Sequence, residues 1–151
     1  MTDAQKKDTF TADIAQLIPH RGRMKLIGAI ERISSDNAVT LSVVSETWPL
    51  CSGTSVNPIV LIEVAAQTAG VFSCWKKGEN ISAFAAGMLT GIKCADFFVD
   101  EVPVHAELTT TATIMYSLDD YEAMEVTVMM GRTRLCKVQL QIFGLRAEPG
   151  V

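Results

Sequence analysis

Residues 58–75 limit what this chain can fold into, because they have helical spacing and are apolar around most of the helix circumference. Asn57 supplies a cap before this segment, and Pro58 suits the first helical position. A Lys-Lys-Gly sequence at residues 76–78 gives a typical C-terminal end. Such a helix must be covered by other structure on nearly all sides, which only an enclosing layer of sheet provides in a chain of this length.

Two polar side chains interrupt this apolar helix, Glu63 and Gln67, which lie four positions apart on one stripe. A carboxylate removed from water must be paired, hydrogen-bonded or protonated, because an isolated buried charge is costly. Glu63 is therefore a candidate for proton transfer. The alternative is that Glu63 bonds Gln67 or a partner chain and only fixes the helix.

The rest of the sequence is predicted to form mainly strands. A short amphipathic helix is expected at Thr11–Leu17, and a loop rich in Pro, Ser and Gly at Thr47–Val56. The β-rich runs are Met24–Ile33, Asn37–Glu46, Ser82–Phe98, Val102–Leu118, Tyr121–Met130 and Arg132–Phe143. The predicted fold class is α+β, with an antiparallel sheet wrapped around one long central helix, and the 151 residues suffice for a single domain, 1–151.

Composition excludes several classes of function. The formal charge of −4 argues against a nucleic-acid partner. The first ten residues are polar and do not form a signal peptide, and Glu63 and Gln67 argue against a membrane span, so a cytoplasmic protein is expected. The four cysteines have no paired or His-associated spacing, which favours reduced packing residues and predicts no metal site; no cofactor is expected.

Three segments resemble the hotdog fold, and within it the β-hydroxyacyl-acyl-carrier-protein dehydratases of fatty-acid synthesis. Leu17-Ile-Pro-His-Arg21 with the following Met24–Ile27 is similar to that family's early Leu-Pro-His-Arg and strand. Leu61–Gln67 is similar to its central helix, with Glu63 and Gln67 in register. The strand and bend that follow are matched by Gly91-Ile92, Ala95, Phe97 and Val102-Pro103. The resemblance implies a protein that handles acyl thioesters of acyl carrier protein or coenzyme A, with Glu63 as its catalytic carboxylate.

The sequence departs from this family at two positions of the implied site. The family's catalytic His belongs to a loop before the helix, and Thr47 stands at its position in this chain. Thr47 is no base near neutral pH without an activating neighbour. In the family, a Pro-Gly pair before the helix offers a backbone N–H to the thioester carbonyl. Asn57-Pro58 stands at this position in the present chain, and proline has no N–H. A shift of one residue would let the Ile59 N–H donate instead.

These departures leave the activity open. Dehydration is in doubt, and the alternatives are an acyl-thioester hydrolase that uses Glu63 and a non-catalytic acyl-binding or scaffold protein. Gln67, Pro58, Ile59 and Trp48 are the predicted substrate-binding residues, Trp48 because it lies in the loop that should carry the His. An enzyme would be a hydro-lyase or a thioester hydrolase.

The other polar candidates have competing interpretations. His20 and His105 are interpreted as structural or surface residues, although histidine is suited to proton transfer. Arg21, Arg23 and Lys25 would share one strand face if the strand starts early, where they could dock a carrier or simply face solvent. A homodimer is expected, because a lone sheet of this kind leaves an edge strand to be paired.

Overall fold

The central helix is present almost as predicted. The computed structural model describes residues 13–76 and 85–145, and its one α-helix, α1, spans Val60–Lys76. Asn57 caps the helix, since the Ile59 backbone N–H donates to Asn57 Oδ1 at 3.0 Å. This helix is not long enough and apolar enough to cross a membrane, and the described residues contain no other candidate span.

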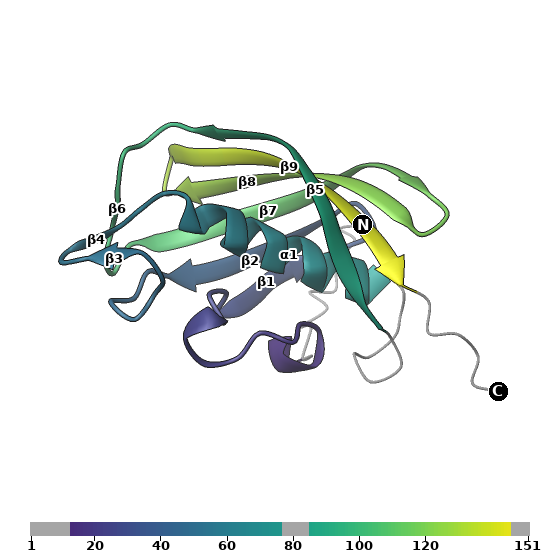
Figure 1. Ribbon diagram of the computed structural model, residues 1–151, viewed down its shortest axis with the longest axis horizontal. Coiled ribbons are helices and arrows are strands. Elements are labelled where there is room, and N and C mark those ends of the chain that lie inside the picture. Colours follow the sequence, from purple (N-terminus) through teal and green to yellow (C-terminus); the bar gives the residue numbers. More distant parts are fainter. Residues whose placement is uncertain (1–12, 77–84, 146–151) are drawn as a thin grey trace, which may run out of the picture.

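A six-stranded antiparallel sheet curves around α1 (Figure 1). Its strands lie in the order β1-β2-β7-β8-β9-β5, and every neighbouring pair is antiparallel. The strands are β1 (Ala29–Ile33), β2 (Asn37–Val43), β5 (Ala85–Phe97), β7 (Glu107–Leu118), β8 (Tyr121–Met130) and β9 (Thr133–Leu145). The sheet wrapped around one helix is the predicted hotdog arrangement.

A small second sheet lies beside the start of α1 (Figure 1). It is formed by β3 (Cys51–Ser52), β4 (Ser55–Val56) and β6 (Val102–Pro103), in the order β3-β4-β6. The first two strands form a hairpin inside the segment expected to be a loop, and Gly53 at its turn has a φ of 66°. The predicted strand 102–118 is interrupted after β6, where His105 has a φ of 71° and the chain bends into β7.

The N-terminal segment differs most from the prediction. Residues 11 and 12 lie outside the described part, and Ile14–Gln16 form only a 3-10 turn, η1, capped by the Asp13 side chain. A segment of seven residues is too short to sustain an α-helix without strong packing. A second 3-10 turn, η2, follows at Gly22–Met24, and strand β1 begins at Ala29.

The core lies between the sheet and α1. In β8 and β9 the even-numbered side chains Val126, Val128, Val138 and Leu140 point inward and are at most 1% exposed, as the two-residue period of a strand requires. From the helix, Leu61, Val64 and Phe72 are fully buried against them. Burial of these apolar surfaces is the main source of the fold's stability.

One side of α1 is less covered than the rest. Starting just before α1, partly or fully exposed residues recur at helical spacing and form what we call the open stripe: Ile59, Ile62, Glu63, Ala66 and Gly70. The helix is therefore buried around most of its circumference, as predicted, but the sheet does not enclose Glu63. The segment before β1 lies along this part of the helix instead (Figure 1).

None of the four cysteines forms a disulfide, as their spacing predicted. Cys74 and Cys136 are buried, and burial raises the pKa of the Cys136 thiol to about 12. That thiol remains protonated and acts as a packing residue. Cys94 is exposed on β5, where a hydrogen bond from its Sγ to the Asp96 carboxylate raises its pKa.

Candidate functional site

Glu63 lies in the first turn of α1 on the open stripe, and its side chain is 34% exposed. The sequence predicted an acid fully enclosed by sheet. The structure instead leaves the carboxyl group in contact with both protein and solvent, because only loop residues cover this side of the helix. Glu63 is therefore accessible to a ligand while its partners hold it in place.

His20 is the nearest titratable partner of Glu63. The loop between η1 and η2 brings His20 Nε2 to 3.0 Å from Glu63 Oε1, and the imidazole is 32% exposed. The other ring nitrogen, Nδ1, is buried and has no hydrogen-bond partner among the described residues. From the sequence, His20 was considered as a substitute for the missing His, but a structural or surface role was preferred for it. The structure supplies an imidazole from a segment 43 positions upstream of Glu63.

Gln67 holds the same carboxyl oxygen from the other side. Its Nε2 donates to Glu63 Oε1 at 3.0 Å and to the Met24 carbonyl, while its Oε1 accepts from the backbone N–H groups of Leu26 (2.9 Å) and Ile27 (3.4 Å). The side chain is fully buried. Gln67 was predicted to bind substrate, but every hydrogen-bonding atom of its carboxamide is engaged within the protein, so it positions Glu63.

These contacts determine which atom of Glu63 faces outward. Both His20 and Gln67 contact Oε1, and no described residue bonds Oε2. Because Gln67 donates to Oε1, a proton carried by the carboxyl group belongs on Oε2, and His20 Nε2 is then also a donor to Oε1. The free oxygen Oε2 is the atom able to give a proton to a bound molecule or take one from it.

Arg21 fixes the turn that carries His20. Its guanidinium donates to the carbonyl oxygens of Ala15 (2.6 Å), Ile18 (2.7 Å) and His20 (2.8 Å). The expected strand face of basic residues is absent, because Arg21 precedes η2 and the strand starts only at Ala29. Arg23 Nε donates to the Thr47 carbonyl at 3.1 Å.

The remaining predicted site residues lie around the start of α1. Thr47 is exposed, its hydroxyl is 2.9 Å from the hydroxyl of Ser45, and no described contact joins it to Glu63. Trp48 is 5% exposed and packs in the core. Pro58 is buried, whereas the Ile59 side chain is 53% exposed. The structure thus brings Glu63 and Gln67 together but does not add Thr47 or Trp48 to them.

His105 lies outside this cluster, on the surface. Its side chain is 79% exposed, and its Nε2 is 3.9 Å from Glu46 Oε1. The described residues contain no group of His, Cys, Asp or Glu side chains arranged to hold a metal ion. The titratable groups that meet at the site are the Glu63 carboxyl group and the His20 imidazole.

Comparison with solved structures shows the same fold in several proteins. A chain of the dehydratase heterocomplex ApeI:P from Xenorhabdus doucetiae superposes with a TM-score of 0.78 at 20% identity, covering 89% of this chain and 92% of that one. A hypothetical thioesterase from Streptococcus pneumoniae, solved with coenzyme A, gives 0.61 at 16% identity, covering 78% and 87%. The E. coli PaaI protein from the phenylacetic acid degradation operon gives 0.61 at 14%, covering 76% and 81%.

Sequence comparison identifies the family. No curated protein sequence matches the chain significantly. Residues 12–148, however, match the ApeP-like family, described as ApeP dehydratase. The match includes the His20 turn, the helix with Glu63 and Gln67, and all six strands of the large sheet. This chain has the hotdog fold and belongs to the ApeP-like dehydratase family.

Proposed function

We propose that this protein is a hydro-lyase that dehydrates 3-hydroxyacyl thioesters in fatty-acid or polyketide metabolism. The observation that carries the proposal is the His20–Glu63 pair, 3.0 Å apart, with Glu63 Oε2 free. Membership of the ApeP-like dehydratase family supports the same activity. We further propose a single hotdog domain, a cytoplasmic location and an acyl group carried by acyl carrier protein or coenzyme A.

The geometry suggests how the elimination proceeds. Glu63 Oε2 takes the α-proton of the substrate, the electron pair of that C–H bond forms the carbon–carbon double bond, and the bond to the β-hydroxyl breaks. The proton on Oε2 then passes to the departing hydroxide, which leaves as water, so that the carboxylate is regenerated. His20 Nε2–H and Gln67 Nε2 hold Oε1 throughout and orient the carboxyl group.

This proposal changes the significance of Thr47. The sequence suggested that Thr47 had replaced a required His and that the proton-transfer pair was incomplete. In the structure the imidazole comes from a different loop, through His20, so the absence of a His at position 47 does not remove the pair. Dehydration therefore becomes the first candidate.

Hydrolysis is the second candidate, because a free carboxylate oxygen can also activate a water molecule. Two assays on the purified protein distinguish dehydration from hydrolysis. One offers a trans-2-enoyl thioester, and the other offers a saturated acyl thioester. We expect the enoyl compound to be hydrated, which is measured as a loss of its ultraviolet absorbance. We expect no release of free thiol. Thiol release from the saturated compound would instead favour the hydrolase. The absence of both reactions, with acyl thioester still bound, would favour a binding or scaffold protein.

Arg21 offers a test of how His20 is held. Arg21→Ala removes three hydrogen bonds from the turn that ends in His20, and we expect kcat for hydration to fall about 10- to 100-fold because small misplacements of a catalytic group are costly. Arg21→Lys should recover part of the loss, since an ammonium group reaches fewer of these carbonyls. Steady-state kinetics measures both variants.

Arg23→Ala is the matched control for Arg21, because Arg23 belongs to the same segment but its hydrogen bond among the described residues goes to a different loop. Its kcat should stay within a few-fold of the parent value. A pH profile of kcat reports whether the Arg21 variants disturb the His20–Glu63 pair itself. Equal activity of Arg21→Ala and the parent protein would contradict a positioning role.

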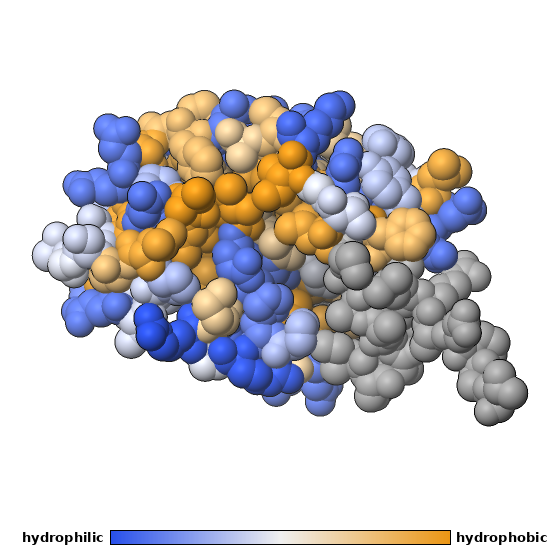
Figure 2. Space-filling view, viewed as in Figure 1, coloured by the Kyte–Doolittle hydropathy of each residue, from blue (hydrophilic) through white to orange (hydrophobic). Residues whose placement is uncertain are grey.

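We also propose a homodimer that pairs through β5. This strand is the last in the sheet, hydrogen-bonded to β9 on one side only, and it exposes apolar side chains at Leu89, Ile92 and Phe97. Figure 2 shows apolar surface gathered in a band across the face on which α1 and β5 lie. A long apolar edge strand left unpaired would promote aggregation, so native proteins cover it.

Light scattering coupled to size-exclusion chromatography tests this interface. We expect the mass of a dimer for the parent chain and of a monomer for Ile92→Asp, because a carboxylate at an apolar interface must be desolvated. Leu118→Asp is the control, since Leu118 is 67% exposed but lies on β7. A monomeric parent chain would exclude the homodimer and leave a different hotdog chain as the partner, as the heterocomplex ApeI:P suggests.

A further inference from the structure

Leu50, the residue before strand β3, has an unusual backbone conformation for an apolar residue. Its φ of 60° lies in the left-handed region, where the Cβ atom of an L-residue comes too close to the following carbonyl oxygen. Among the described residues, the other left-handed positions hold glycine or a polar residue: Gly22, Gly53, Gly131, His105 and Asp119. Leucine at this position therefore needs an explanation.

The contacts of Leu50 within its own chain do not explain it. The side chain is 58% exposed, so packing against the core recovers little of the cost of the strained backbone. The Leu50 carbonyl accepts from the Asn57 N–H at 3.1 Å, a bond that a glycine would make equally well. A strained residue that its own fold does not favour indicates contact with another molecule.

A second exposed apolar side chain lies near Leu50, at the start of the open stripe. Asn57 joins the two, because its N–H donates to the Leu50 carbonyl and its Oδ1 accepts from the Ile59 N–H at 3.0 Å. The Ile59 side chain is 53% exposed. Leu50 therefore extends the apolar surface of the open stripe beyond the start of α1.

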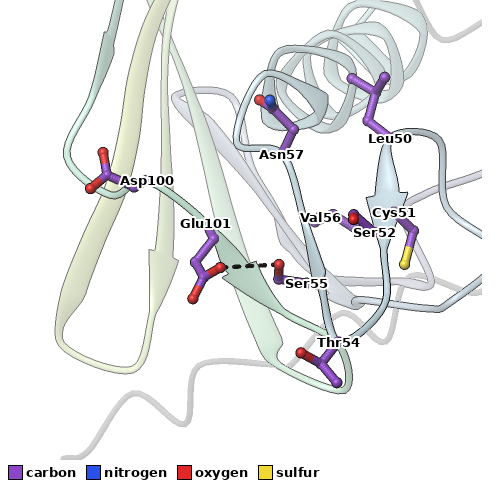
Figure 3. A pocket seen from close by; sticks show the side chains of 9 residues that line it. All are labelled: Leu50, Cys51, Ser52, Thr54, Ser55, Val56, Asn57, Asp100 and Glu101. Carbon is purple, nitrogen blue, oxygen red and sulfur yellow. Dashed lines mark hydrogen bonds between the residues drawn. The ribbon is translucent and has the colours of Figure 1, made fainter.

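A cleft of about 660 Å³ separates Leu50 from the segment that continues β5 (Figure 3). Asp100 and Glu101 form the opposite wall, and the Ser55 hydroxyl donates to Glu101 Oε2 at 3.2 Å. These acids closely follow Phe97 and Phe98, which are 39% and 53% exposed at the end of β5. The apolar surface proposed to pair two copies through β5 thus continues to the cleft that Leu50 lines.

The charge of this cleft limits what can cover Leu50. The residues that line it include two carboxylates and no lysine or arginine. An acidic acyl carrier and the phosphate groups of coenzyme A would be repelled here. A second copy of this chain fits better, because a two-fold interface joins the same apolar surface on both copies.

We infer that Leu50 is an anchor of the homodimer, where its side chain packs against the apolar surface of the partner copy. The inference rests on the pairing through β5 proposed above and adds the start of the β3–β4 hairpin to that interface. Burial of the leucine on association offsets the strain of its backbone. The strain thus destabilises the single chain, whereas the side chain stabilises the dimer.

Leu50→Gly separates these two effects. In the monomeric Ile92→Asp background, we expect the thermal unfolding midpoint to stay unchanged or to rise by about 2–4 °C, because glycine relieves the strain. In the parent background, the same substitution should raise the dimer dissociation constant about tenfold or more, because an apolar anchor is lost. Sedimentation equilibrium measures the dissociation constant. A residue that packs only within its own chain would not stabilise the monomer and weaken the dimer in this way.

Two control variants accompany this test. Asp119 is also left-handed, with a φ of 53°, but it lies in the β7–β8 turn. Asp119→Gly should therefore leave the dissociation constant unchanged, while its unfolding midpoint does not fall. Leu50→Ala removes the apolar side chain but keeps a Cβ atom, so it should weaken the dimer without raising the midpoint.

Three results would overturn the inference. An unchanged dissociation constant for Leu50→Gly in a dimeric parent would remove Leu50 from the interface and leave the pairing through β5 in place. If that constant is unchanged while KM for a trans-2-enoyl thioester rises, Leu50 contacts substrate instead. A monomeric parent would reject the homodimer and the role of Leu50 together.

Discussion

Glu63→Gln is expected to lower kcat for hydration of a trans-2-enoyl thioester by about 10²- to 10⁴-fold, the usual contribution of a positioned acid or base. Glutamine has the size of glutamate and can still contact Gln67 and His20, but it offers no carboxyl oxygen to carry the proton. KM should change little, because the substitution preserves the shape of the site. Steady-state kinetics together with the unfolding midpoint separates loss of chemistry from loss of folding.

Two substitutions of His20 then distinguish orientation from proton transfer. His20→Gln keeps an N–H donor near the position of Nε2, whereas His20→Ala removes it. If His20 only orients Glu63, His20→Gln should retain activity within about tenfold while His20→Ala loses about as much as Glu63→Gln. Equal losses in both variants would assign the imidazole a proton-transfer step of its own. Full activity in Glu63→Gln would remove Glu63 from the mechanism.

Gln67→Leu should lower the free energy of unfolding by about 3 kcal/mol or more, the largest stability effect we expect from one substitution in this site. Leucine has a similar volume, but it leaves the Leu26 and Ile27 N–H groups and the Met24 carbonyl without their partner. Each buried, unpaired backbone group costs about 1–3 kcal/mol. Denaturant unfolding measures the change.

Thr68→Val provides a matched control on the next helical position. Thr68 is also fully buried, and its hydroxyl bonds the Thr40 hydroxyl at 2.8 Å and the Val64 carbonyl, neither of which belongs to the segment before β1. We expect a smaller loss, about 1–2 kcal/mol, because fewer groups are left unpaired. An unfolding midpoint for Gln67→Leu equal to that of the parent would show that residues 24–27 do not depend on this carboxamide.

Local patterns in the sequence were sufficient for most of the fold. The limits of α1 followed from a cap at Asn57, a proline at the first helical position and a Lys-Lys-Gly end, and they differ from the structure by at most two residues. The strands of the large sheet were predicted from their β-rich composition and turn residues. These features act between residues close in the chain, where spacing alone determines the interaction.

The strand β1 shows where local patterns fail. The β-rich run from Met24 predicted a strand beginning there, but the Leu26 and Ile27 N–H groups donate to Gln67 and so cannot pair with a neighbouring strand. A buried carboxamide 40 positions away thus competes with the sheet for these donors. Nothing in residues 24–28 themselves reveals that competition.

The sequence by itself determined an apolar helix with one acid and one carboxamide at fixed spacing, and a set of strands able to enclose it, because helix and strand periods follow from local geometry. Only the tertiary structure decided that His20 is the partner of Glu63, that Gln67 is buried and that Oε2 remains free. The physical reason is that these contacts join segments some 40 positions apart, through Gln67 and through the turn that Arg21 holds with its hydrogen bonds. A hydrogen bond between such distant segments leaves no periodic signal in the sequence.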